Sequence, residues 1–360
     1  MKLRFRRILI DARNGIGDFV YFSPVLAALR REYKEAKITL ISWWVTRELA
    51  KTCPYVDEVL ILEEETDLKG KTVGDFVSGL LDRPPFGLAL DFAHPPLSPL
   101  IMKVSRASKR IGFKRDDESD RVYTDLVEVR KDEPAVLQYK RFLDCIGVAT
   151  EELRPEVWLS KEDKALAGKI LEENSPEEGD LLIGVHPGTG VVARRWEAEK
   201  FAGLADKIVT EYRAKIILFG SDYVRTSEGE KGAVSEIEMA KEISCLMRSK
   251  PLNLAGRLSL AQFAALTSHL DLYIGLDTGP THIASVMGAP TVAIFGPGEY
   301  KAWKPYGNSQ VVRKEMDCSP CGPSGCDNPK CLKELTVDEV YGAVERLMRR
   351  RKDGREEKIC

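Results

Sequence analysis

Short apolar segments alternate with helix-length segments along most of this chain, and that alternation constrains the fold more than any other feature. The first unit runs from an apolar segment at 7–12 through a glycine-rich turn into a segment where Val25, Leu26 and Leu29 recur at helical spacing. Strands joined through helices pair in parallel, by right-handed crossovers. The sequence therefore predicts an α/β protein with mostly parallel sheets.

The alternation falls into two series, separated by a connecting segment at residues 147–160. Strands are predicted at residues 7–12, 38–41, 59–62 and 88–91 in the first series, and at 181–185, 215–219, 252–254, 272–274 and 291–295 in the second. Further helices are predicted at 46–51, 73–81, 135–146, 198–212, 235–247, 260–269 and 281–287. We place one Rossmann-like, doubly wound domain at 1–155, a second at 156–348 and a charged tail at 349–360. Such a tandem predicts an inter-domain cleft at the carboxyl ends of the strands, where nucleotides bind.

Composition excludes several classes of protein. With 43% hydrophobic residues among 360, the chain can bury a large core, which excludes a disordered protein. A formal net charge of -2, from 54 basic and 56 acidic residues, argues against a surface devoted to nucleic acid. No apolar run approaches the roughly 20 residues that a membrane span needs, and the first residues lack the pattern of a secretory signal. We therefore expect a cytoplasmic protein.

The strongest local signal is the segment 272–284, where an apolar strand runs into a helix. Gly279 tolerates unusual backbone angles, and Pro280 suits the first helical position because its missing N–H would be unpaired there. Free N–H groups and the positive end of the helix dipole favour an anion. We predict a diphosphate site formed by four residues of this segment: Asp277, Thr278, Gly279 and His282. The alternative is that these polar side chains only cap the helix or lie on its surface.

Other predicted strands also end in polar or glycine-rich segments. Asp18 lies at the start of the first helix, where the helix dipole keeps its carboxylate ionised, and it is a candidate general base. Arg194 and Arg195 follow the glycine-containing segment 186–190 and are candidates to stabilise charge on a leaving group. The turn at 295–298 would let a ligand approach the backbone closely. The alternatives are a simple helix-start charge, a solvated basic pair and an ordinary turn.

Four of the eight cysteines lie in one short segment: Cys318, Cys321, Cys326 and Cys331. Four thiolates match the ligand count of a structural zinc site, although the spacing is neither that of a standard zinc ribbon nor that of a ferredoxin. Disulfides, which a reducing cytosol disfavours, and free thiols are the alternatives. We predict a structural zinc ion at this loop, called the cysteine loop below.

Together these motifs resemble glycosyltransferase family 9, the lipopolysaccharide heptosyltransferases. The matching segments cover nearly the whole chain: Gly15-Ile16-Gly17-Asp18, Ser23-Pro24-Val25-Leu26-Ala27-Ala28-Leu29, Arg194-Arg195-Trp196, Leu254-Ala255-Gly256-Arg257-Leu258-Ser259-Leu260, Asp277-Thr278-Gly279-Pro280-Thr281-His282 and Phe295-Gly296-Pro297. The resemblance implies a GT-B fold and an inverting transfer of heptose from ADP-heptose to the lipopolysaccharide inner core, with no metal or other cofactor needed for catalysis. It assigns the base to Asp18 and the diphosphate site to the loop at 277–282.

The chain departs from the family pattern at two places. Arg194 stands where the family usually has a lysine, which keeps the charge but replaces a point charge with a planar fork. Where the family often has a glutamate that binds the ribose, this chain offers Asp222, with Glu228 farther along. No Asp-x-Asp pair occurs in the sequence to hold magnesium on a diphosphate, which agrees with metal-independent catalysis.

The first domain is expected to bind the acceptor, because it carries a basic stretch. The stretch consists of Lys103, Arg106, Lys109, Arg110, Lys114 and Arg115. It would suit phosphorylated, acidic sugars, and with Lys2, Arg4, Arg6 and Arg7 it predicts peripheral contact with an anionic inner membrane. A solvated basic face is the alternative.

Two other classes of function remain open at this point. One is a sugar-nucleotide epimerase or hydrolase with the same two-sheet architecture, and the other is a non-catalytic, metal-stabilised nucleotide-binding module. An oxidoreductase is disfavoured, because the turn at 15–18 lacks the third glycine of the dinucleotide fingerprint.

Overall fold

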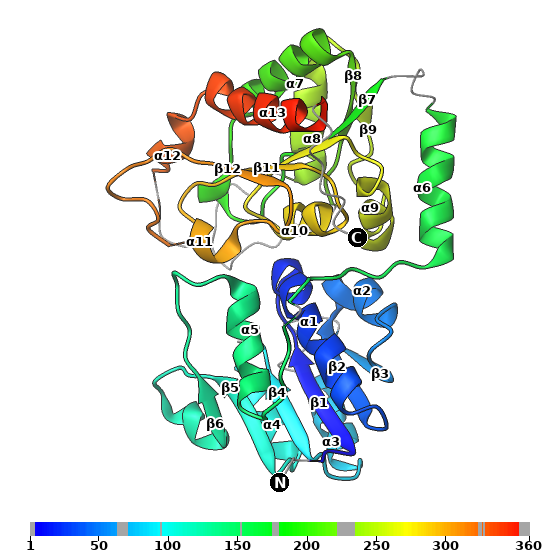
Figure 1. The fold of residues 1–360 in the computed structure, drawn as a ribbon, viewed down its shortest axis with the longest axis vertical. Coiled ribbons are helices and arrows are strands. Elements are labelled where there is room, and N and C mark those ends of the chain that lie inside the picture. The colour runs from blue at the N-terminus through cyan, green and yellow to red at the C-terminus, as the bar shows by residue number, and fades with distance from the viewer. Residues whose placement is uncertain are drawn as a thin grey trace. The chain divides into compact units, whose positions relative to one another are not determined.

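The computed structural model describes residues 4–62, 71–93, 96–151, 153–174, 180–221, 235–322, 326 and 328–352. The chain forms two compact units, unit 1 at Met1–Trp158 and unit 2 at Leu159–Cys360, each built on a six-stranded sheet (Figure 1). Lys2, Asp222, Glu228 and the last eight residues of the predicted tail, 353–360, lie outside the described residues.

Unit 1 contains a parallel sheet in the order β3-β2-β1-β4-β5-β6. Its strands are β1 (Arg7–Ala12), β2 (Lys37–Trp43), β3 (Glu58–Leu62), β4 (Leu88–Asp91), β5 (Lys109–Phe113) and β6 (Asp125–Val127). Its helices are α1 (Ile16–Glu32), η1 (Trp44–Thr46), α2 (Arg47–Lys51), α3 (Lys71–Leu81), α4 (Ser98–Val104), η3 (Glu118–Val122) and α5 (Ala135–Asp144). Helices α1 and α5 pack together, as do α3 and α4.

Unit 2 repeats this architecture with the strand order β12-β11-β10-β7-β8-β9, again parallel throughout. Its strands are β7 (Leu181–His186), β8 (Ala214–Leu218), β9 (Leu252–Asn253), β10 (Leu272–Leu276), β11 (Thr291–Ile294) and β12 (Ser309–Val312). Its helices are α6 (Lys161–Glu173), η4 (Val192–Arg194), α7 (Ala198–Tyr212), α8 (Glu236–Leu246), α9 (Leu260–Thr267), α10 (Gly279–Val286), α11 (Tyr300–Trp303), α12 (Lys330–Lys333) and α13 (Val337–Lys352). Helix α7 packs against α8 and α13, whereas α9 packs against α6 and α10.

Both sheets have the strand order of a doubly wound fold. In unit 1 the direction of winding changes between β1 and β4, and in unit 2 it changes between β7 and β10. Ligands of such sheets bind at the carboxyl ends of the strands next to this point. The strand order therefore predicts that a ligand binds near the residues that follow β1 in unit 1, and near those that follow β7 and β10 in unit 2.

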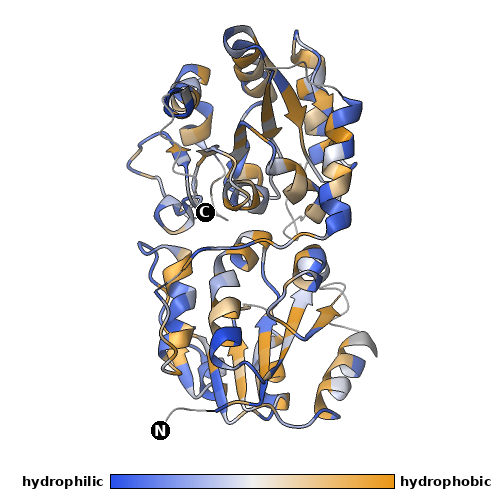
Figure 2. Cartoon of the chain, turned by 45° about the vertical axis from the view of Figure 1, so that its right-hand side comes forward, coloured by the Kyte–Doolittle hydropathy of each residue, from blue (hydrophilic) through white to orange (hydrophobic). Residues whose placement is uncertain are grey.

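The core of each unit explains why these segments form regular structure. Strands β1, β4 and β10 are buried almost throughout, as expected of central strands covered on both faces. Figure 2 shows hydrophobic residues concentrated on the strands and on one side of several helices. Helix α13 is highly charged, yet Val340, Val344 and Leu347 form a buried stripe along it. Residues 349–352, assigned above to a charged tail, belong to this helix.

Candidate active site

In unit 2, helix α10 begins directly after β10, at the point where the strand order reverses. Gly279 is its first residue and Thr278 its N-cap, with Pro280 in the first turn, as the sequence predicts. The Thr278 side chain makes no capping hydrogen bond, and its Oγ1 is buried without a partner among the described residues. Pro280 has no N–H and the Thr281 N–H donates to the Thr278 carbonyl at 3.1 Å, so the helix start offers the buried Thr278 hydroxyl and the N–H of Gly279, which has no partner within the helix.

Arg194 and Asp277 form a largely buried ion pair beside this helix start. The Arg194 Nη1 lies 3.1 Å from Asp277 Oδ2 and donates a hydrogen bond of 2.9 Å to the Asp277 carbonyl oxygen. Burial raises the pKa of Asp277, and the charge of Arg194 acts against that shift. The Arg194 Nε is buried and has no partner within the described part of the chain. One N–H of this guanidinium is therefore left for a ligand.

His282 lies buried in the first turn of α10, with its ring centroid 5.9 Å from that of Trp303. Burial, and then the neighbouring charge of Arg194, lowers the pKa of His282 to about 3. The imidazole is therefore neutral at neutral pH. In that form one ring nitrogen can donate a hydrogen bond while the other accepts.

The turn after β11 closes the site on another side. A Cβ added to Gly298 would lie 2.2 Å from Asp277 Oδ2, so only glycine fits there without displacing the carboxylate. This turn also touches the cysteine loop, because Ser319 Oγ donates to the Gly296 carbonyl and the Gly322 N–H donates to the Pro297 carbonyl. The predicted turn at 295–298 thus links the site to the cysteine loop.

A glutamate that the sequence reasoning missed lies at the ends of β7 and β8. Glu236 Oε2 accepts hydrogen bonds from the Ser221 N–H at 2.7 Å and from Ser221 Oγ at 2.9 Å, and lies 3.6 Å from His186 Nε2. A Cβ on Gly188 would lie 2.3 Å from the Glu236 Cδ. The sequence pattern indicated Asp222 and Glu228 instead, and both lie outside the described residues. The capping serine at 235, followed by an acidic helix start, was the available signal.

In unit 1, Asp18 lies in the first turn of α1, directly beyond β1. Its Oδ1 accepts a hydrogen bond of 2.7 Å from the Tyr139 hydroxyl. A Cβ on Gly15 would lie 3.2 Å from Asp18 Oδ2. The structure thus places the predicted base at the end of the central strand of unit 1, and it gathers Arg194, Asp277 and the α10 start in unit 2.

The basic stretch of unit 1 is less open than the sequence suggested. Lys109 Nζ lies 2.7 Å from Asp125 and Lys114 Nζ lies 3.0 Å from Asp116. Arg110 donates to the Val122 carbonyl, and Arg115 pairs with the buried Asp91. Strand β5 begins at Lys109, in the middle of the stretch, and these four of its six charges pair within the sheet and its neighbouring loops. Lys103 and Arg106 are exposed.

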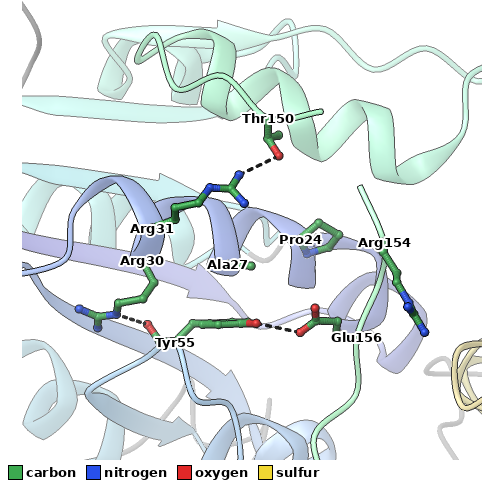
Figure 3. Close-up of a pocket in the computed structure, with 8 residues that line it drawn as sticks. All are labelled: Pro24, Ala27, Arg30, Arg31, Tyr55, Thr150, Arg154 and Glu156. Carbon is green, nitrogen blue, oxygen red and sulfur yellow. Dashed lines mark hydrogen bonds between the residues drawn. The ribbon is translucent and has the colours of Figure 1, made fainter. Parts of the chain in front are cut away.

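A separate pocket of about 270 Å³ lies in unit 1, along the flank of α1 (Figure 3). It is lined by Pro24, Ala27, Arg30, Arg31, Tyr55, Thr150, Arg154 and Glu156. Within it Arg31 donates to Thr150 Oγ1, Arg30 to the Tyr55 carbonyl, and the Tyr55 hydroxyl to Glu156 (Figure 3). Much of its polar lining is thus already paired, and Asp18 is not part of it.

The cysteine loop does not form a closed metal site in this arrangement. Cys318 and Cys321 are exposed, Cys326 is half-buried and Cys331 is buried. Burial raises the pKa of Cys321, and the nearby thiols of Cys326 and Cys318 raise it further. Within the described residues, no group of three or more histidine, cysteine, aspartate or glutamate side chains is arranged to hold a metal ion. None of the seven cysteines described forms a disulfide.

The helices in the described part of the chain include none that is long and apolar enough to cross a membrane.

Comparisons with known proteins agree with the fold and with the motifs. Residues 82–332 match the model of glycosyltransferase family 9 (heptosyltransferase). The chain is 24% identical over 351 residues to lipooligosaccharide heptosyltransferase 2 of Campylobacter jejuni. The matched region covers 95% of this chain and 99% of that protein. A family 9 glycosyl transferase from Veillonella parvula superposes with a TM-score of 0.81 at 22% identity, over 96% of this chain and 98% of that one.

The ADP-heptose LPS heptosyltransferase II of E. coli superposes with a TM-score of 0.74 at 20% identity, over 96% of this chain and 99% of that one. These superpositions confirm the predicted GT-B class of fold, with two parallel-sheet α/β units. The family match covers more than half of the chain. The chain therefore belongs to glycosyltransferase family 9, and it is a glycosyltransferase.

Proposed function

We propose that this glycosyltransferase moves heptose from ADP-heptose to the inner core of lipopolysaccharide. The observation that carries the proposal is the start of α10, where Thr278 Oγ1 and Arg194 Nε are buried without partners among the residues described. A buried polar atom left unpaired costs about 1–3 kcal/mol, which an anionic ligand would recover. The heptosyltransferases to which the chain is similar along nearly its whole length support heptose as the transferred sugar.

In this proposal unit 2 holds the donor. Arg194, the Thr278 hydroxyl and the backbone N–H of Gly279 bind the diphosphate, and the neutral His282 donates one further hydrogen bond. We assign ribose recognition to Glu236, because its carboxylate is already held in place by Ser221 and can accept hydrogen bonds from sugar hydroxyls. The two carboxylates that the sequence pattern indicated for this part, Asp222 and Glu228, lie outside the described residues.

The proposed reaction is a single displacement that inverts the anomeric carbon. Asp18 accepts the proton of the acceptor hydroxyl as its oxygen bonds to that carbon, and the bond from the carbon to the phosphate oxygen breaks. ADP leaves with the bonding electron pair. The positive charge of Arg194 and the α10 dipole stabilise the charge on the departing diphosphate. Protein groups then take the part that a metal ion plays in enzymes with an Asp-x-Asp pair, and this sequence has no such pair.

Replacing Asp18 tests the role of the base. In Asp18→Asn the side chain keeps its size but can no longer accept the proton, so we expect transfer to fall at least about a hundredfold. ADP affinity, measured by calorimetry, should stay unchanged because the donor residues are in unit 2. Equal loss of transfer and of ADP binding would contradict the assignment.

A donor screen tests the sugar and the nucleotide. We expect ADP-heptose and ADP to bind in calorimetry and to raise the melting temperature, with UDP-sugars binding at least tenfold more weakly. Selective, tight binding of UDP-sugars would overturn the donor while leaving the family intact.

We further propose that unit 1 binds the phosphorylated acceptor at the cytoplasmic face of the inner membrane. The exposed charges of Arg4, Arg6, Lys103 and Arg106 support this, at about 1 kcal/mol for each charge near an anionic surface. Flotation with vesicles tests it: binding to anionic vesicles that high salt reverses is expected. Equal binding to neutral vesicles, or none to either, would count against it.

The four cysteines remain a proposed structural zinc site. Their thiols are near enough to shift one another's pKa, and the exposed Cys318 and Cys321 side chains would have to turn toward Cys331 to complete the ligand set. Metal analysis of protein purified without added zinc should find about one zinc per chain in the wild type and none in Cys318→Ser/Cys321→Ser. Metal-free wild-type protein would exclude the site.

A further inference from the structure

A chain of hydrogen bonds in unit 1 leads to the carboxylate of Asp18. The Tyr139 hydroxyl donates to Asp18 Oδ1 at 2.7 Å. The side chain of Asn14 hydrogen-bonds the same hydroxyl, and because that hydroxyl's proton is given to Asp18, Asn14 is the donor. Asn14 Nδ2 also donates to the Phe92 carbonyl at the end of β4. Three groups in series are thus anchored to the sheet.

An aromatic cage holds the Tyr139 ring in this position. The ring centroid lies 5.9 Å from that of Phe22 in α1, 5.4 Å from that of Phe92 and 5.8 Å from that of Phe113 in β5. Tyr139 is only 3% exposed. A phenol packed on several sides in this way has few other rotamers available, so its hydroxyl stays where Asp18 meets it.

The phenol also stays protonated. Burial and the negative charge of Asp18 raise the pKa of Tyr139 well above its usual value of 10. Tyr139 is therefore neutral at neutral pH and donates its proton to the hydrogen bond with the carboxylate. It cannot itself take the acceptor's proton while the Asp18 carboxylate is ionised beside it.

We propose that Tyr139 is a positioning residue for Asp18: supported by Asn14, it holds Oδ1 and so fixes the orientation of the carboxylate that takes the acceptor's proton. This inference rests on the proposed function, in which Asp18 is the base. A hydrogen bond to the carboxylate makes it a slightly weaker base, but orientation matters more, because a misplacement of about 1 Å can cost roughly a hundredfold in rate. The acceptor's proton then moves to the Asp18 carboxylate as the new glycosidic bond forms, and ADP departs with the electron pair of the broken bond.

Tyr139→Phe in the full-length protein tests the proposal, since it keeps the ring in the cage and removes only the hydroxyl. We expect kcat to fall about ten- to a hundredfold, with the donor KM and the ADP affinity unchanged. The acidic limb of the kcat/KM profile should move to higher pH, because the carboxylate loses a hydrogen bond that favours its ionised form. A purely structural role would alter stability without moving that limb.

Tyr123→Phe is a matched control, because the Tyr123 hydroxyl also donates to a buried aspartate, Asp91, in the same unit. It should keep kcat within about twofold and leave the acidic limb in place. If Tyr139→Phe does not fold, Asn14→Ser removes the support without touching the cage and should lower kcat in the same direction by a smaller factor.

The outcomes separate the two proposals. Transfer by Asp18→Asn at the wild-type rate would show that Asp18 is not the base, and the proposed function fails. Loss of transfer in Asp18→Asn combined with wild-type kcat and pH profile in Tyr139→Phe would overturn only the positioning role.

Discussion

In unit 2, Arg194 has a structural role in addition to the donor binding proposed for it. It lies between the carboxylate of Asp277 and the helix start, and its charge is the main group that keeps this buried carboxylate ionised. Arg194 contacts both the carboxylate and the carbonyl oxygen of Asp277 through one nitrogen, Nη1, and its planar guanidinium keeps a further N–H at Nε that a lysine would lack.

We expect Arg194→Ala to be costly for this reason. Removing one partner of a buried pair leaves the Asp277 charge unpaired, which should lower the free energy of unfolding by roughly 3 kcal/mol. ADP affinity should fall at least about tenfold. Urea denaturation and calorimetry measure the two effects. Lys169→Ala removes an exposed helical pair with Glu173 and should cost less than about 0.5 kcal/mol. If both variants lost a similar amount of unfolding free energy, burial of the Arg194–Asp277 pair would not explain the expected cost.

His282 makes the stability of the protein depend on pH. Its pKa is about 3 in the folded chain and near 6.5 when unfolded. Between these values the unfolded chain binds the proton and the folded chain does not, so stability is lost as the pH falls from about 6.5 toward 3. From pH 7 to pH 5 the wild type should lose up to about 2 kcal/mol more than His282→Gln.

Denaturation curves of both proteins at the two pH values measure this difference. Burial raises the pKa of Asp91 to about 7, and this makes the free energy of unfolding decrease as the pH rises, opposite to the effect of His282. The Asp91 effect is the same in both proteins, so it cancels in the comparison. Parallel pH dependence in wild type and variant would show that His282 is not buried as a neutral residue.

At the scale of elements, the turn at 295–298 connects three parts of unit 2. It follows β11, touches the cysteine loop through Gly296 and Pro297, and lies against Asp277 through Gly298. The turn therefore contacts both the cysteine loop and Asp277, two residues before the start of α10.

Gly298→Ala should disturb the donor site specifically. Its Cβ would lie 2.2 Å from Asp277 Oδ2, so the carboxylate must move away from Arg194, and we expect ADP affinity to fall about tenfold. Gly168→Ala in α6, where nothing lies within 4 Å, should leave ADP affinity unchanged and stabilise the helix by about 0.5–1 kcal/mol. Calorimetry and thermal melts compare the two, and unchanged ADP binding in Gly298→Ala would count against the site.

The strength of local patterns explains which elements the sequence could predict. All nine predicted strands and all the predicted helices exist in the structure, because each carries a clear apolar period. The strands β5, β6 and β12 were not predicted: β5 begins with Lys109 and Arg110, β6 has three residues, and β12 is an edge strand. Helices α6 and α13 were not predicted because both are rich in charge: α6 buries Ala167 alone among its residues, and the buried stripe of α13 is narrow.

At the scale of the whole molecule, each unit has its own hydrophobic core. One buried cluster extends from Ile183 to Met348 within unit 2, and another from Leu9 to Tyr123 within unit 1. Separate cores of this kind favour separate unfolding transitions.

Scanning calorimetry of the full chain should therefore resolve two transitions. ADP at a hundred times its dissociation constant should stabilise one of them by about 2.7 kcal/mol and leave the other in place. The stabilised transition should be the one that Arg194→Ala lowers. A shift of both transitions by ADP, or a shift only of the one that Arg194→Ala leaves unchanged, would contradict the assignment of the donor to unit 2.

The sequence by itself determined the α/β class, the two series of strands and the start of α10, because these depend on residues a few positions apart. Only the tertiary structure decided which distant side chains meet: Arg194 with Asp277, Tyr139 with Asp18, and Glu236 with His186. It also turned much of the basic stretch into internal ion pairs. The physical reason is that strand order and crossovers bring together the ends of strands far apart in the chain, and burial there changes the charge that each group carries.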